Sequence, residues 1–544
     1  MKTLPTKSAG ILLFLMSSLP LFAQSSSSGG SPLLIGLIAT CIILVLWALF
    51  TLASNLLKIE AKKHGIDTEK SGFSIYPWIS DFLPGKPKYT GSDRYIKLTK
   101  GHDILLEGEA KPEIHVADVH RFAIKPTDFH GMSPIPKVEF EIGQSVKAGD
   151  PLFYDKKMDK IQYCSPVSGE IVAIERGEKR SISAVVVLAD KNIQYKNINV
   201  PSIEQSSREE LVDFFQSSGL WALINERPFD RVPDATKIPA NIFISTFDTA
   251  PLAPDANFII EGNQESFQKG LDVLSKLTSG KVHLGLDGRD AKKSPHATFV
   301  NATGVEKTYF AGKHPVGNVG IQIHHVSPIK AGQTVWTLGI QEVITIGRMF
   351  LYQKFDAGRI VALTGAELEN PVYVKTYQGA NIGDLLKGNL KNPESRIISG
   401  DVLSGKQVYA DGFLGFRDDQ ITVIKEGNEY ELFGWLLPIE PRPSISGTFP
   451  NFLYPDHKFE ANTNTHGEKR AMVVTGQYEE VLPVDTYPQH LFKAILSNDL
   501  EKMEGLGILE LTEEDVALCE FVCTSKNPIQ QILRQGLETV KEQS

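Results

Sequence analysis

The chain has 544 residues, enough for about three or four domains. Its formal charge is −9, from 56 Lys and Arg against 65 Asp and Glu. This argues against sequence-independent binding of nucleic acid, which needs clustered Lys and Arg. Hydrophobic residues make up 42% and charged residues 22%, so most of the chain is globular. Four cysteines are too few for a disulfide scaffold.

The N-terminus has the pattern of a secretory signal. Lys2 and Lys7 form a short basic region, and the apolar run from Ile11 to Ala23 follows it. This run is too short to cross about 30 Å of hydrocarbon, and it ends at a small residue. We predict a signal peptide over residues 1–23, cut after Ala23, and an uncharged linker over residues 24–32.

Residues 33–57 are an uncharged, mostly apolar stretch that is long enough to span a bilayer with some tilt. The alternative is a buried core helix. Lys58, Lys62 and Lys63 follow the stretch, and no charge precedes it in the linker. The positive-inside rule therefore places the rest of the chain in the cytoplasm. An uncleaved signal gives the same orientation. The prediction is a single-pass anchor in the inner membrane with a soluble body on the cytoplasmic side.

Residues 58–94 are predicted to be a juxtamembrane linker. Its aromatic residues Tyr76, Trp78 and Phe82 suit either the lipid interface or packing against the body.

Residues 95–200 alternate apolar and polar positions between tight turns. Val138, Phe140 and Ile142 point to one face, and Ser165–Ile174 repeats the scheme. Paired hairpins of this kind resemble the barrel-sandwich fold of biotinyl and lipoyl carriers. Lys157 and Lys160 lie in the connecting stretch, but neither sits at a clear symmetric hairpin tip. We expect solvated lysines there, the alternative being a covalently modified carrier lysine.

Residues 201–356 are predicted to be a Rossmann-like α/β domain. A capping box from Ser207 to Glu210 begins a helix, and Ile242–Ser245 is a short strand. Apolar residues at helical spacing from Phe267 to Leu277 precede a strand at Val282–Leu286. This order favours a βαβ unit in a mainly parallel sheet.

Short strands return over residues 357–435, which indicates an α+β module of the β-grasp, ligand-binding type. Residues 436–544 are predicted to be a helical domain, in which Thr512–Asp515 has capping signals.

The usual nucleotide and metalloprotease motifs are missing: no GxGxxG follows a strand, and neither GxxxxGK[ST] nor HExxH occurs. The nearest glycine-rich loop is Gly312–Gly320. Its amides could hold a phosphate or approach a flat ring, or its glycines could serve only a tight loop. His314 in this loop could donate to a quinone oxygen or be an ordinary loop histidine.

The remaining candidate ligands do not form a set. His324 and His325 are adjacent in a predicted strand, so they point to opposite faces, cannot share a metal and are expected to pack. Cys519 and Cys523 share a helix face, and only Cys164 remains in the body, which is too few for a four-thiolate cluster. We expect core thiols, with a redox or metal role as the alternative. The sequence therefore assigns no catalytic, cofactor-binding or metal residue.

Six stretches, in order from about Tyr95 to the C-terminus, resemble the A subunit of the bacterial sodium-translocating NADH:quinone reductase. They are SPVSGEIVAIERGEKR at Ser165–Arg180, SGLWALINERPFDRVP at Ser218–Pro233, AGKHPVGNVGIQIHHVSPI at Ala311–Ile329, IISGDVLSG at Ile397–Gly405, ELFGWLLP at Glu431–Pro438 and EEDVALCEFVC at Glu513–Cys523.

This resemblance implies a barrel-sandwich segment, an α/β domain, a β-grasp domain and a helical domain. The family is similar to the C subunit of the Rnf complex and to the NADH- and flavin-binding subunit of respiratory complex I. The Gly312–Gly320 loop then looks like a remnant of a flavin loop, and Cys519 and Cys523 lie where a cluster segment would be. Residues 1–94 depart from the family, whose typical member begins near Tyr95 without a membrane segment.

The resemblance also implies a function. The chain would be a non-redox peripheral subunit of a six-subunit translocase (Na(+)-NQR), binding no cofactor and helping to form the quinone-reduction site. The other five subunits, named B, C, D, E and F, would carry the flavins, the iron–sulfur centre and the NADH site. The complex would couple electron transfer from NADH to ubiquinone to outward sodium transport. The alternative is a membrane-anchored assembly or adaptor protein that binds no ligand.

Overall fold

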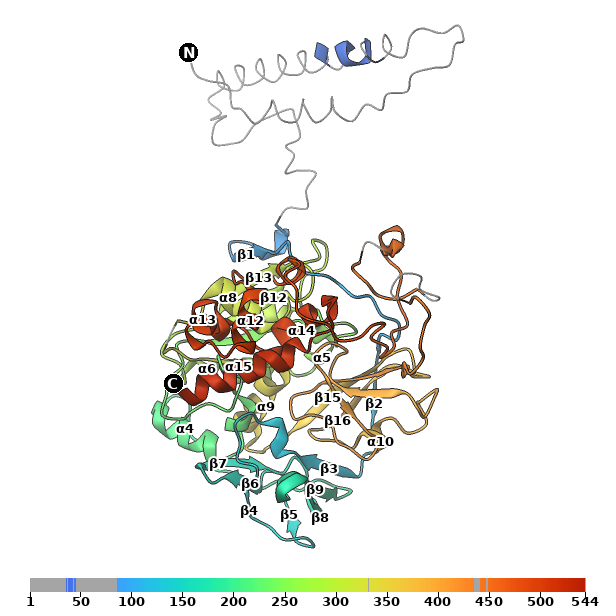
Figure 1. The fold of residues 1–544 in the computed structure, drawn as a ribbon. Coiled ribbons are helices and arrows are strands. Elements are labelled where there is room, and N and C mark those ends of the chain that lie inside the picture. Colours follow the sequence, from blue (N-terminus) through green and yellow to red (C-terminus); the bar gives the residue numbers. More distant parts are fainter. Residues whose placement is uncertain are drawn as a thin grey trace, which may run out of the picture. The chain divides into compact units, whose positions relative to one another are not determined.

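The computed structural model describes residues 36, 38–42, 44, 45, 86–330, 332–434, 441–446 and 449–543. It divides into two compact units, Met1–Gly85 and Lys86–Ser544 (Figure 1). The predicted signal peptide 1–23, most of the predicted span 33–57 and residues 58–85 of the predicted linker 58–94 lie outside the described residues. Among the residues that are described, no helix is both long and apolar enough to cross a bilayer.

The first sheet of the second unit is mainly parallel, as predicted, with the order β1-β13-β12-β11-β14-β10. Its β11 and β12 pair in parallel across the helix α6 (Gln264–Ser275), and only β10 runs antiparallel to its neighbour. The strands are β1 (Arg94–Lys97), β10 (Asn225–Arg227), β11 (Ile242–Ser245), β12 (Val282–Asp287), β13 (Glu306–Ala311) and β14 (Val335–Leu338).

The helices of this layer are α4 (Arg208–Ser217), α5 (Ala256–Ile259), α6, α7 (Ala297–Val300), α8 (Val319–Val326) and α9 (Ile340–Tyr352). The backbones of α6 and α9 approach closely, because a Cβ on Gly347 would lie 1.7 Å from the carbonyl oxygen of Ser266. The predicted capping box of α4 is present: the Ser207 side chain accepts from the amide of Glu210, and the Glu210 carboxylate accepts from the amide of Ser207.

The barrel-sandwich segment consists of two small sheets and lies at the opposite end of the second unit from β1 and β13 (Figure 1). One has the order β3-β9-β8-β5 and the other β4-β6-β7. The strands are β3 (Arg121–Ile124), β4 (Lys137–Val138), β5 (Ser145–Val146), β6 (Pro151–Asp155), β7 (Met158–Cys164), β8 (Gly169–Arg176) and β9 (Ile182–Ala189).

The two candidate lysines of the connecting stretch, Lys157 and Lys160, occupy different positions. Lys156 and Lys157 form the turn between β6 and β7, so the stretch does have a hairpin tip, contrary to the prediction. The Lys157 amide donates to the Asp155 carboxylate over 3.0 Å, which stabilises the turn. Lys160 lies within β7, where its ammonium is 3.7 Å from the Asp213 carboxylate.

The third sheet has the order β18-β17-β19-β15-β16-β2 and contains the strands predicted over residues 357–435. The strands are β2 (Lys111–Val116), β15 (Gly358–Thr364), β16 (Val372–Tyr377), β17 (Arg396–Ser399), β18 (Lys406–Val408) and β19 (Gln420–Ile424), and the short helix is α10 (Ile382–Leu385). The edge strand β2 comes from before the barrel-sandwich segment, so the chain enters this sheet twice.

The predicted helical domain 436–544 is helical from Gln477 onward, whereas its described residues before Gln477 contain only a short 3-10 helix. Its helices are α11 (Gln477–Val481), α12 (Pro488–Leu496), α13 (Leu500–Gly505), α14 (Glu513–Val522) and α15 (Ile529–Gln543). Short 3-10 helices are Lys88–Thr90, Pro126–Asp128, Glu178–Arg180, Trp221–Leu223, Pro450–Leu453 and Ile508–Glu510.

The strand predicted around His324 and His325 is wrong, since both residues lie on α8. The alternation of apolar residues there belongs to a helix that begins at Val319, after the N-cap residue Asn318. His324 Nδ1 contacts the Glu510 carboxylate, and His325 Nε2 lies 2.7 Å from the Pro483 carbonyl oxygen. The prediction that they point to opposite faces is also wrong, because the two rings lie edge to face with their centroids 5.0 Å apart. No group of three His, Cys, Asp or Glu in the described part of the chain could hold a metal ion.

Candidate functional site

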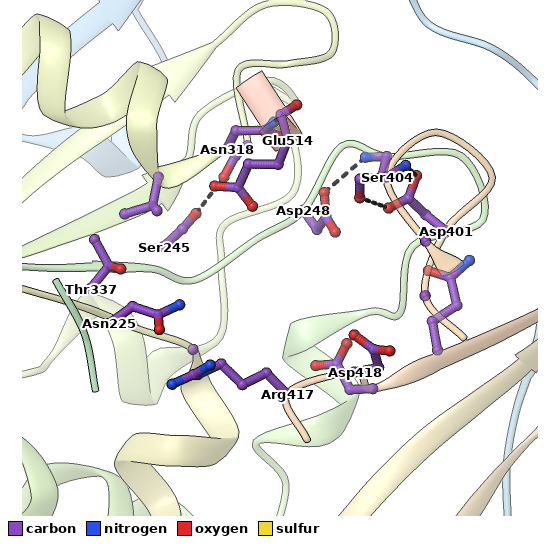
Figure 2. A pocket seen from close by; sticks show the side chains of 18 of the residues that line it. Asn225, Ser245, Asp248, Asn318, Thr337, Asp401, Ser404, Arg417, Asp418 and Glu514 are labelled. Carbon is purple, nitrogen blue, oxygen red and sulfur yellow. Dashed lines mark hydrogen bonds between the residues drawn. The ribbon is translucent and has the colours of Figure 1, made fainter. Parts of the chain in front are cut away.

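A cavity of about 560 Å³ lies at the carboxyl edge of the first sheet, where open α/β folds usually bind ligands. Ser245 and Leu338, the last residues of β11 and β14, form part of its wall. The third sheet contributes residues 400–406 and 417–420, and α14 contributes its first turn. Figure 2 shows Asp248, Asp401 and Ser404 close together on one side of this cavity. The site thus combines parts of the chain that are far apart in sequence.

The charge of the wall is strongly acidic. Eight carboxylic side chains face three Lys or Arg side chains. The acids are Asp128, Asp230, Asp248, Asp401, Asp418, Asp419, Glu513 and Glu514, and the bases are Arg227, Lys406 and Arg417. Acidic side chains thus outnumber basic ones in the wall, although burial keeps some of the carboxyls protonated.

Two of these carboxyls hold protons near neutral pH. Burial raises the pKa of Asp419 to about 7, although the nearby Arg359 opposes the shift. Burial also raises the pKa of Glu514 to about 8, against the effect of Arg227. The pKa of Asp248 is raised by burial and by the Asp401 charge. The cavity wall can therefore donate protons at physiological pH.

The amides of the Gly312–Gly320 loop are used within the protein. The His314 amide donates to the Asp103 carboxylate over 2.8 Å, and the Gly317 amide donates to the Thr249 hydroxyl over 3.0 Å. A carboxylate and a hydroxyl thus occupy donors that a phosphate would need. Of the two interpretations of the loop, the structure favours the tight loop over the phosphate cradle.

His314 is buried, and it lines the cavity. Its Nδ1 lies 3.1 Å from the Thr249 hydroxyl, while its Nε2 is buried without a hydrogen-bond partner. Burial lowers the pKa of the imidazole, so it is neutral at physiological pH. The sequence singled out this residue, and the structure places it at the cavity.

The first turn of α14 closes one side of the cavity and packs on the N-terminus of α8. Arg227 at the end of β10 contacts Thr512, Glu514 and Asp515, and its guanidinium NH1 lies 3.2 Å from the Asp515 carboxylate. The Asn318 side chain donates to the Glu514 carbonyl oxygen over 2.9 Å. The capping box predicted at Thr512 is present. Arg227 was missed as a site residue, because its partners lie nearly 300 positions away in sequence.

The three thiols of the body do not come together. Cys519 and Cys523 lie in the core of the helical region, where the Tyr478 hydroxyl donates to the Cys523 sulfur over 2.9 Å. Cys164 belongs to a different core, and burial raises its pKa to about 12. Burial also raises the pKa of Cys519. Cys164 and Cys519 are therefore protonated core thiols, and Cys523 is buried in the same core as Cys519.

Three family models match the chain. The NqrA N-terminal barrel-sandwich hybrid domain matches residues 96–190, the NqrA second alpha/beta domain matches residues 206–355, and the NQRA C-terminal domain matches residues 360–410.

Curated relatives are similar over the same part of the chain. The A subunit of the Na(+)-translocating NADH-quinone reductase of Alcanivorax borkumensis is 37% identical over 453 residues, which is 82% of this chain and 99% of the relative. The same subunit of Neisseria meningitidis serogroup B is 38% identical, over 82% of this chain and all of the relative. A solved NAD+-reducing [NiFe]-hydrogenase aligns at 10% identity with a TM-score of 0.32, over 64% of this chain and 67% of that chain.

Proposed function

Because the chain belongs to the NqrA family, the A subunits of the Na(+)-translocating NADH-quinone reductase, we propose that it is a non-redox peripheral subunit that helps to form the quinone-reduction site. The whole complex then passes electrons from NADH to ubiquinone and moves sodium outward. Its partners are the other five subunits, B to F. The isolated chain is inactive in this proposal, as a part of a translocase whose redox chemistry takes place in other subunits.

The observation that supports a quinone role is the pair of protonated carboxyls in the cavity wall. Reduction of a quinone to a quinol consumes two electrons and two protons. Asp419 and Glu514, with pKa values of about 7 and 8, can supply protons at neutral pH, whereas ordinary carboxyls cannot. A quinone head is uncharged, so the acidic wall does not repel it.

The same cavity gives reasons for the chain to bind no flavin or NADH. Both carry phosphate, for which the wall offers only three cationic side chains among a larger number of carboxyls. The loop amides that could hold phosphate are engaged by Asp103 and Thr249. In this proposal the flavins, the iron–sulfur centre and the NADH site all belong to other subunits.

The N-terminal residues add an anchor to this family member. The relatives are covered almost completely by 82% of this chain, so residues 1 to about 95 extend beyond them. We assign residues 1–23 to a signal peptide, 33–57 to a transmembrane helix and 58–94 to a linker. The body then lies on the cytoplasmic side of the inner membrane. It consists of the barrel-sandwich segment with β3 to β9, the α/β domain joined by β1, the β-grasp domain joined by β2, and the helical region that begins at α11.

The test is the substitution Asp419→Asn in the assembled complex, with Asp411→Asn as the matched control. Asp411 is an exposed carboxylate of the same region that does not line the cavity. We expect Asp419→Asn to lower quinone reduction about 10²-fold or more while NADH oxidation by an artificial acceptor continues. Unchanged quinone reduction, together with no binding of a short-chain ubiquinone to the full-length chain, would favour the adaptor role instead.

A further inference from the structure

Two polar side chains of the cavity wall come from neighbouring strands of the first sheet. Asn225 of β10 and Thr337 of β14 are direct partners in the antiparallel pairing of these strands, so their side chains lie on the same face of the sheet. Both line the cavity (Figure 2). In the described part of the chain, no hydrogen bond or ion pair joins either side chain to another residue.

The burial of these side chains makes the missing partner costly. Thr337 is only 5% exposed, and Asn225 is half-buried. Buried polar side chains are usually hydrogen-bonded, because an unsatisfied group costs about 1–3 kcal/mol. The cavity, whose wall the two side chains form, is where a partner for them can bind.

Arg417 provides a further donor near this pair. Its Nη2 donates to the carbonyl oxygens of Ala222 and Ile224 over 2.8 and 3.4 Å, and Ile224 directly precedes Asn225 in the chain. The guanidinium carbon also lies 5.7 Å from the ring centroid of Phe129. These contacts hold the side chain in place. The other terminal nitrogen, Nη1, makes no hydrogen bond to any residue that the structure describes.

The three side chains suit an uncharged oxygen atom of a ligand. Asn225 lies between Thr337 and Arg417 in Figure 2, and an amide, a hydroxyl and a guanidinium can all donate hydrogen bonds. Burial lowers the pKa of Arg417, against the effects of the Asp230 and Glu342 charges. Carboxylates of the chain thus already counter the guanidinium charge, so the ligand does not need to bring a negative charge.

We propose that Asn225, Thr337 and Arg417 form a binding subsite for an uncharged acceptor oxygen of the ligand, such as a ring carbonyl of a quinone. The Arg417 Nη1 and the Asn225 amide donate to this oxygen, and the Thr337 hydroxyl donates to it or to a neighbouring oxygen of the ligand. The identification of the ligand as a quinone rests on the proposed function. In that scheme the subsite holds the ring, while Asp419 and Glu514 supply protons.

The test is steady-state kinetics of the assembled complex with a short-chain ubiquinone. Thr337→Val removes the hydroxyl and keeps the side-chain shape, and Asn225→Leu removes the amide. A hydrogen bond contributes about 1 kcal/mol, so each substitution should raise KM about 5-fold and change kcat by less than about 2-fold. A KM that is unchanged in both variants would overturn the proposal.

Thr308→Val is the matched control for Thr337→Val. Thr308 lies on β13 of the same sheet, is also 5% exposed and does not line the cavity. Its side chain likewise makes no hydrogen bond within the described part of the chain. Thr308→Val should leave KM unchanged, and an equal rise of KM in this variant would overturn the proposal.

Thermal melts of the full-length chain in detergent, without quinone, separate ligand binding from a structural role. Because the Thr337 hydroxyl bonds to nothing in the described part of the chain, Thr337→Val should keep or raise the melting temperature. A clearly lower melting temperature together with an unchanged KM would show that the hydroxyl serves the fold and would overturn the proposal.

Benzamide and benzoate, which have nearly the same shape, test the charge of the ligand group. Neutral benzamide should compete with ubiquinone more strongly than benzoate, and the reverse order would overturn the assignment to an uncharged oxygen. The kcat of Asp419→Asn tests the proposed function separately. A raised KM in Thr337→Val with a normal kcat in Asp419→Asn would support the subsite and reject the proton donor, and the opposite pair of results would reject the subsite alone.

Discussion

Two helices of the protein begin with the same local device, a capping box, in very different surroundings. At α4, Ser207 and Glu210 exchange hydrogen bonds of 3.0 and 3.2 Å at the exposed surface. At α14, in the interior, the amide and the hydroxyl of Thr512 both donate to the Asp515 carboxylate over 3.0 Å. Asp515 also pairs with Arg227 and lies against Gly320 of α8. The first box stabilises only its own helix, whereas the second joins the α/β layer to the helical region.

The difference shows that a local motif predicts a helix start but not what packs on it. Both boxes are visible in the sequence with the same spacing. Only the fold decides that one carboxylate remains in water and that the other is enclosed beside a guanidinium. Buried charge pairs are costly to break, while exposed caps contribute modestly. The two boxes therefore should respond unequally to the same kind of substitution.

The largest effect is expected from Asp515→Ala compared with Glu210→Ala. Loss of Asp515 leaves Arg227 buried beside fewer carboxylates and should cost about 3–5 kcal/mol of unfolding free energy. Loss of Glu210 removes one exposed cap hydrogen bond and should cost about 0.5–1 kcal/mol. Denaturant titration of the two full-length variants measures both values. Equal losses of unfolding free energy in the two variants would contradict the difference between the buried and the exposed capping box.

The contact between α8 and α14 can also be tested on the α8 side, by the substitution Gly320→Ala. The new methyl group would overlap the Asp515 carboxylate and should cost about 1–3 kcal/mol. Gly505→Ala is the control, since nothing lies within 4 Å of a Cβ there and Gly505 is also in a helix. That substitution should be neutral or stabilising by up to about 1 kcal/mol. A tolerated Gly320→Ala would mean that the helix start is not tightly filled.

The cavity beside the buried box should make stability depend on pH. The folded-state pKa of Asp419, about 7, lies above its unfolded value, so the unfolded chain loses this proton first as pH rises. Stability should then fall between about pH 4 and 7, by roughly 1–2 kcal/mol because the carboxyl is partly exposed. Asp419→Asn should flatten this decline, as thermal melts at pH 5 and pH 7.5 can measure. If stability declined equally with pH in Asp419→Asn and in the wild type, the pKa of Asp419 would lie near its usual range.

The smallest effects are expected in the core behind α14. Cys519→Ala and Cys523→Ala each remove one buried sulfur and should cost on the order of 1 kcal/mol. Quinone reduction by the assembled complex should persist in both variants. Complete loss of activity in an intact complex would instead make these thiols redox or metal residues.

Local signals in the sequence predicted most elements of the fold. The parallel βαβ unit and both capping boxes follow from patterns a few residues long. The predicted alternation of Val138, Phe140 and Ile142 on one face is wrong, because β4 ends at Val138 and Ile142 lies exposed in the turn before β5. The helix α8 was misassigned, because six apolar-alternating residues suit a strand and a short helix equally. The joining of β1 and β2 to two different sheets depends on long-range pairing, for which the sequence has no local signal.

The candidate site was much less predictable than the fold. The sequence singled out His314, which does line the cavity. It could not show that Asp419 and Glu514 titrate near neutrality, because their pKa values depend on burial between separate segments. Arg227 and Asp515 are 288 positions apart, and only the folded chain shows them as a pair.

The most direct measurement is photolabelling of the assembled complex with a photoreactive ubiquinone, followed by mapping of the labelled peptides. The predicted result is labelling within the segments 245–259, 400–406, 417–420 and 512–517, which contain residues of the cavity wall, with protection by unmodified quinone. Labelling of this chain should also decrease in Asp419→Asn and remain unchanged in Asp411→Asn. Protectable labelling confined to other subunits, or to segments of this chain away from the cavity, would contradict a quinone site at this position.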